Sequence, residues 1–197
     1  MAIIPYPSPA RHDGEPLLQP IVAAQTNPSE LTGSRQTVDL GYSWWLATVT
    51  TARMSREDAR RWRLFFGRVR GPVNSFRIPV TGDDQHAGTF TVRAQGVGSG
   101  YSLVTDGWPV SATTLLAGDR VTVGDQLMVL DADVTANASG VATLQFHESL
   151  RGAVADNTVI TTKRPHLLAS LPKDAPALGL GLARLQEGFS FEAMEAY

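Results

Sequence analysis

The clearest pattern of apolar and polar positions lies between residues 41 and 79. A run rich in aromatic and β-branched residues at 42–50 predicts a strand. Apolar residues spaced three or four positions apart then predict an amphipathic helix over 56–67. A second strand follows at 75–78, and Pro79 ends it. We interpret this strand–helix–strand unit as a structural building block.

The helix has clear boundary signals. Ser55 is a good N-cap, and Asp58 three residues later gives a pattern like a capping box. Gly67 is expected to release the chain towards the next strand. On the apolar face, Trp62 and Phe65 are expected to pack on a sheet, and Phe76 of the following strand is assigned to the same core.

The pattern changes between residues 88 and 164. Short alternating runs, separated by Gly, Asp and Asn turns, are typical of a small all-β barrel or sandwich. Within it, residues 120–129 form an expected hairpin around Gly124 and Asp125. We interpret the glycines of 96–100 as a flexible connector, since no helix pattern follows to bind a phosphate.

Both ends of the chain are assigned from their prolines and from the apolar runs between the turn residues. The first 20 residues contain five prolines, so we expect 1–17 to be an extended arm along the surface or on a neighbouring molecule. A first strand is expected at 19–22 and an interruption at 27–29. Runs at 179–185 and 189–197 are expected to be strands that pair back with the first part of the chain. The predicted organisation is a β domain of 18–87 and 165–197 with 88–164 inserted.

Composition limits the possible functions. A chain of 197 residues with 43% hydrophobic residues can bury a real core, and 18 Gly and 12 Pro favour many short strands. The net charge of −2 does not favour nucleic-acid binding. Of the 17 cationic residues, all except Lys163 and Lys173 are arginines. Such an excess of arginine over lysine suits protein interfaces, although a GC-rich genome would also produce it. No run is long enough for a membrane helix, so we expect a soluble protein.

Candidate catalytic and metal motifs are incomplete. Asp131 and Asp133 begin a pattern like a calcium loop, but Ala136 and Ala142 occupy the positions that need Gly and Glu. The four His are too widely spaced to suggest a metal site, and Cys is absent. No Gly-x-Ser-x-Gly elbow is present. We therefore expect no enzyme activity, cofactor or metal, with a hydrolase as a weak alternative.

Adjacent tryptophans offer a different kind of site. Trp44 and Trp45 point to opposite faces of a strand, so one can be in the core while the other faces outward. An outward Trp is typical of an oligomer interface. The alternative is a carbohydrate platform, to which Trp108 and Tyr101 would also contribute.

Two patches of sequence carry a resemblance to a known family. The first runs from Trp45 through Met54-Ser55-x-x-Asp58-Ala59-x-x-Trp62-x-x-Phe65 to Arg70-Gly71 and Ser75-Phe76-x-x-Pro79; the second is Leu116-Ala-Gly118-Asp119-x-Val121-x-Val123-Gly124-Asp125-Gln-Leu127. With Leu150-Arg151 and the closing Phe189-Ser-Phe191-Glu segment, the chain resembles distal tail proteins of long-tailed siphophages and gene transfer agents.

The resemblance implies a structural virion protein. Its members form a hexameric ring between the tail tube protein and the tail-tip hub (baseplate) protein, from a β-sandwich-like domain with one helix. Many members carry an extra small β domain. The implied location is the virion tail, assembled in the host bacterial cytoplasm, with neither nucleic-acid specificity nor membrane insertion. The expected ring interface lies near Trp44, Trp45, Arg53, Arg68 and Arg70. The alternative is a carbohydrate- or receptor-binding β module of a tail tip.

Overall fold

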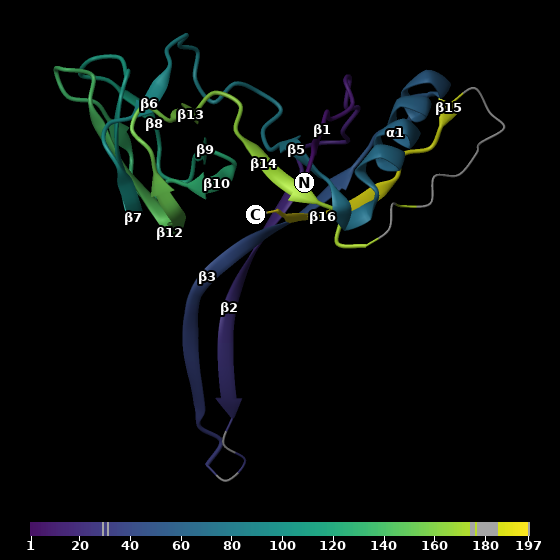
Figure 1. Cartoon of the computed structure of the whole chain (residues 1–197), viewed down its shortest axis with the longest axis horizontal. Helices are drawn as coiled ribbons and strands as arrows, with labels where there is room; N and C mark the ends of the chain where they lie inside the picture. The colour runs from purple at the N-terminus through teal and green to yellow at the C-terminus, as the bar shows by residue number, and fades with distance from the viewer. Residues whose placement is uncertain (29, 31, 174–175, 177–184, 197) are drawn as a thin grey trace.

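The protein is mainly β, with one α-helix among the described residues (Figure 1). The computed structural model describes residues 1–28, 30, 32–173, 176 and 185–196. These residues form two six-stranded sheets and two small two-stranded ones. Of the run predicted as a strand at 179–185, only Leu185 lies within the described residues.

The first sheet is built from both ends of the chain and is antiparallel except at one edge, where β1 runs parallel to β5. The C-terminal strand lies inside this sheet and pairs with both β14 and β3, so the chain end returns to the first part of the fold. In sheet order the strands are β1 (Ile3–Ile4), β5 (Ser75–Pro79), β14 (His166–Ser170), β16 (Ser190–Glu195), β3 (Arg35–Thr50) and β2 (Leu17–Pro28).

The helix α1 (Arg56–Val69) begins as its cap predicts. The Ser55 hydroxyl accepts from the Asp58 N–H at 3.1 Å. The helix continues past Gly67, and Arg70 ends it in a left-handed conformation with φ 55°. A glycine inside a helix costs only about 1 kcal/mol, less than burial of Val69 on the core contributes. The predicted end at 67 was therefore two residues early. A short 3-10 turn, η1 (Gly71–Val73), leads into β5.

The first core is strongly aromatic. Trp62, Phe65 and Phe76 are buried in it, and edge-to-face contacts join Phe65 to the other two at 5.6 and 5.0 Å. Tyr6 packs against all three from the N-terminal segment. The segment predicted as an arm is thus held against this chain itself, since its few apolar side chains complete the core.

The second sheet curls into a nearly closed barrel with its own core. Its first and last strands are joined by an isolated bridge between Leu130 and Phe146, and the Asp131 N–H donates to the Gln145 carbonyl at 2.9 Å. The strands in order are β10 (Gln126–Val129), β9 (Arg120–Val123), β13 (Val159–Thr161), β6 (Val92–Ala94), β7 (Gly98–Asp106) and β12 (Ala142–Val154).

One feature of this barrel differs from the sequence prediction. The segment interpreted as a flexible connector contains the start of β7, because Gly98 and Gly100 pair with β12. That pairing offsets the weak strand preference of glycine.

One barrel residue, Leu127, packs in the first core instead of the second, so the two cores touch. Two further short pairs complete the fold: β8 (Thr113–Leu115) with β11 (Val134–Thr135), and β4 (Met54–Ser55) with β15 (Leu185–Gln186).

The most prominent feature is the long hairpin of β2 and β3, which extends far from the body (Figure 1). The predicted strand at 19–22 is only its base, since β2 continues to Pro28. Pro20 and Pro28 are tolerated because β2 is an edge strand, where a missing N–H can face the open side.

Candidate interaction surfaces

The distal part of the hairpin is largely solvated. We call residues 22–42 the hairpin arm. Val22, Val38, Leu40 and Tyr42 are 59%, 47%, 49% and 57% exposed. A lone two-stranded hairpin is at best marginally stable in water, and in the described residues of the arm β3 pairs with β2 alone. Its unpaired edges and apolar side chains make it a surface suited to a partner.

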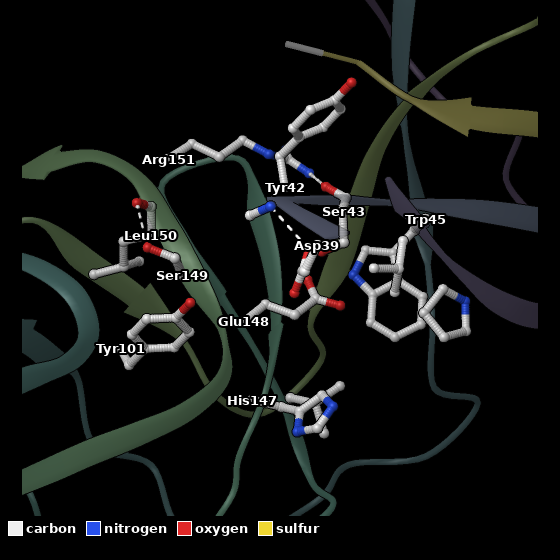
Figure 2. Close-up of a pocket in the computed structure, with 14 residues that line it drawn as sticks. Asp39, Tyr42, Ser43, Trp45, Tyr101, His147, Glu148, Ser149, Leu150 and Arg151 are labelled. Atoms are coloured by element: carbon white, nitrogen blue, oxygen red, sulfur yellow. Dashed lines mark hydrogen bonds between the residues drawn. The ribbon is translucent and has the colours of Figure 1, made fainter. Parts of the chain in front are cut away.

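At the base of the arm a groove of about 630 Å³ separates β3 from the barrel. Figure 2 shows that its side chains come from both sides, the arm and the barrel strands. We call this cavity the groove. It is lined by Pro20, Val22, Asp39, Gly41, Tyr42, Ser43, Trp45, Tyr101, Val129, His147, Glu148, Ser149, Leu150 and Arg151.

One wall of the groove is fixed by a buried ion pair. The Arg151 guanidinium donates to both carboxylate oxygens of Glu195, at 2.8 and 2.6 Å, and to the Ser43 carbonyl at 3.0 Å. The Glu195 carboxylate also accepts from the Trp45 N–H at 3.0 Å. Among the described residues Arg151 is the one arginine that lines the groove, and its positive charge is compensated by Glu195.

Two further carboxylates give the groove an acidic character. Asp39 accepts from the Gly41 N–H at 2.8 Å. Glu148 has one carboxylate oxygen, Oε2, that is buried and has no hydrogen-bond partner among the described residues. Burial raises the pKa of Glu148, while a hydrogen bond from Ser43 opposes the rise. The groove therefore offers acceptors to a guest that brings donors.

A second charged surface lies on α1. Arg56, Arg60, Leu64 and Arg68 follow each other at four-residue spacing, so they form one outward stripe along the helix. Leu64 is 55% exposed. None of the three arginines has an ion pair within the described part of the chain, whereas Arg61 contacts Glu57 at 2.7 Å. We call these four residues the basic stripe.

The tryptophans expected at an interface have different environments. Trp45 is buried, and its indole N–H donates to the Leu127 carbonyl at 3.2 Å. Its assignment to an outward interface was wrong, because it shares a strand face with the buried Ala47 and Val49. Trp44 is half-buried and stacks on Tyr42, with ring centroids 6.0 Å apart.

The arginines expected at that interface are exposed but not gathered. Arg53 precedes the first residue of α1, and its guanidinium lies 3.7 Å from the Glu187 carboxylate. Arg68 and Arg70 lie at the C-terminal end of the same helix. A helix of 14 residues is about 21 Å long, so Arg53 and Arg70 belong to opposite ends. Only Arg68 lies on the basic stripe. No sequence pattern singled out Asp39, and the sequence indicated Tyr101 only as a possible carbohydrate platform.

The proposed carbohydrate platform loses two of its four aromatic residues. Trp108 is 4% exposed, and its indole N–H donates to the Thr105 hydroxyl at 2.8 Å. Both Trp108 and Trp45 were therefore wrongly assigned to an exposed platform, since barrel and sheet packing cover them. Tyr101 is 60% exposed and lines the groove.

Within the described residues no three His, Asp or Glu side chains are grouped so that they could hold a metal ion. In the same part of the chain, no helix is long and apolar enough to cross a membrane. No protein-family model matches the chain, and no curated protein matches its sequence significantly.

Proposed function

We propose that this chain is a non-enzymatic structural protein of a phage-type virion tail, which assembles with copies of itself into a ring. By the sequence resemblance, the ring is hexameric and joins the tail tube protein to the tail-tip hub. The observation that carries the proposal is the hairpin arm. It is a long projection whose apolar side chains and strand edges gain burial only against another molecule.

The size of the arm is consistent with a role in assembly. Full burial of an apolar side chain contributes about 1.5–3 kcal/mol. The four apolar residues of the arm are roughly half exposed, so covering them would contribute on the order of 3–6 kcal/mol to each contact between neighbours. Because a closed ring repeats the contact at every subunit, such a modest gain is multiplied.

Shortening the arm tests this proposal. Replacing residues 24–41 by Asn-Gly joins Ala23 to Tyr42 through a tight turn and keeps the pairing of Val22 with Ser43. We expect the parent to form a ring by mass photometry and the shortened protein to be a folded monomer. Val97→Ser is the matched control, since Val97 is 76% exposed but lies outside the arm.

Locating the protein within whole tail particles is a separate test of the proposal. Cryo-electron microscopy of whole tail particles should find the chain as a ring at the tail tip. A parent protein that stays monomeric at all concentrations and does not join tail tubes would refute the proposal.

A carbohydrate- or receptor-binding module of a tail tip is the second candidate. The groove favours it, because Tyr42 and Tyr101 line it together with carboxylates, as in many sugar sites that combine aromatic faces with polar groups. A glycan array would support this candidate if binding is tight and is lost in Tyr101→Ala.

A further inference from the structure

We propose that the groove binds the basic stripe on α1 of the next copy of the chain, with Arg60 placed at Asp39 and Glu148. This inference rests on the proposed ring and assigns its contact to two particular surfaces. The groove is the acceptor surface, and the stripe is the donor surface.

The groove has the chemistry that recognises a guanidinium group. Asp39 and Glu148 supply carboxylates, and the unpartnered Oε2 of Glu148 is buried where water gives it little compensation. Arginine binds carboxylates through a planar fork of donors and also stacks on aromatic rings. Tyr42 and Tyr101 line the same cavity, so their faces can hold a cation as well.

The stripe has the complementary chemistry. Arg56, Arg60 and Arg68 are exposed around Leu64, and arginine is enriched where proteins associate. In the isolated chain the half-exposed side chain of Leu64 gains little free energy from burial. It can gain more by packing on apolar groups of a partner. Val22 and Tyr42, at the edge of the groove, are exposed apolar side chains of that kind.

The positions of the two surfaces determine the type of assembly. The helix lies at one end of the long axis of the molecule and the barrel at the other (Figure 1). The groove is lined by residues of β3 and of the barrel, so it lies on the barrel side of β3. One copy can therefore offer its stripe to a second copy while its groove receives a third. A contact between unlike surfaces builds rings or filaments instead of two-fold dimers. The groove also continues into the hairpin arm, because Val22, Asp39 and Tyr42 belong to both.

A charge exchange tests the contact. Glu148→Arg and Arg60→Glu are made singly and together, and association is measured by sedimentation velocity and mass photometry. Each single change places like charges together, so we expect association to weaken at least about 100-fold. The double variant restores opposite charges and should recover to within about tenfold of the parent. Raising the salt concentration from about 0.1 to 1 M should weaken the parent ring.

Controls separate this effect from a folding defect. Arg93→Glu changes an exposed arginine on the barrel, away from the stripe, and should leave association unchanged. Asp39→Asn and Glu148→Gln alter charge with little change of shape, and each should weaken association without lowering the melting temperature.

The outcomes distinguish this inference from the proposed function. If the parent forms rings that both single reversals leave intact, the groove contact is wrong and the ring proposal stands. If the two reversals abolish rings but the double variant does not recover, the residues do not meet and the inference is also wrong. A parent that is monomeric and absent from tails refutes the ring itself and the inference with it.

Discussion

The ion pair between Arg151 and Glu195 joins barrel strand β12 to β16 of the first sheet, and its removal should be costly. The Glu195 side chain is fully buried, while that of Arg151 is 27% exposed. In Arg151→Met the carboxylate stays buried with only the Trp45 N–H as a donor among the described residues. We expect a loss of about 3–5 kcal/mol in the free energy of unfolding, as for other buried pairs that lose one partner.

The reverse change should cost less. Glu195→Gln keeps an oxygen that accepts from Trp45, and Arg151 still reaches solvent, so we expect a loss of only about 1–2 kcal/mol. The matched control is Arg77→Met, which breaks the pair of Arg77 with Asp125 at 2.8 Å, where the side chains are 47% and 40% exposed. An exposed pair contributes about 0–1 kcal/mol.

Urea unfolding followed by circular dichroism and tryptophan fluorescence measures all three variants, and Trp45 lies beside the pair. The expected order of loss is Arg151→Met, then Glu195→Gln, then Arg77→Met. The reasoning is refuted if Arg151→Met costs no more than the exposed control, or if Glu195→Gln is the most harmful change.

Three further predictions concern the two cores and pH. Trp62→Ala should lower the free energy of unfolding by about 3–5 kcal/mol, because it empties the centre of the aromatic core; a thermal melt like that of the parent would contradict this. Gly107→Ala should destabilise the barrel by about 1–3 kcal/mol in calorimetry, since Gly107 has φ +83° and a Cβ would collide with a backbone carbonyl; Gly67→Ala, inside α1 with open space around it, is the comparison and should stabilise by up to about 1 kcal/mol. Burial lowers the pKa of His86 and His166 below 6.5, so the unfolded state binds protons first and stability should decline as pH falls below about 6.5. Urea unfolding at pH 7.5 and 5.5 checks the sign in the Glu148→Gln background, because the raised pKa of Glu148 acts in the opposite direction.

The parts of the fold that the sequence predicted well are those with local causes. Ser55 and Asp58 determine where the helix begins, and the spacing of its apolar residues determines which face is buried. The hairpin around Gly124 and Asp125 forms as predicted, because the turn brings adjacent segments together.

The parts that the sequence did not predict depend on distant pairing. The arm contains Pro28 and many polar residues, which weaken the strand signal, and β2 is extended there because it pairs with β3 along its whole length. The groove likewise depends on distant segments. Glu148 of the barrel and Asp39 of the arm are far apart in the sequence but lie on two sides of the same cavity. Alternation predicted that one of Trp44 and Trp45 is buried, and the small or branched Ala47 and Val49 on the same face as Trp45 were the available signal for which one.

The distribution of charge gives the proposed ring a direction. The net charge of −2 does not reveal that arginines gather on α1 while the carboxylates of Asp39 and Glu148 line the groove. Two stripes brought together would place arginine against arginine, and two grooves would place carboxylate against carboxylate, so both two-fold pairings are disfavoured. The contact of stripe with groove is the one that pairs opposite charges. Electrostatics would thus select a single head-to-tail order, and the hairpin arm would then add its apolar burial to a contact whose orientation is already determined.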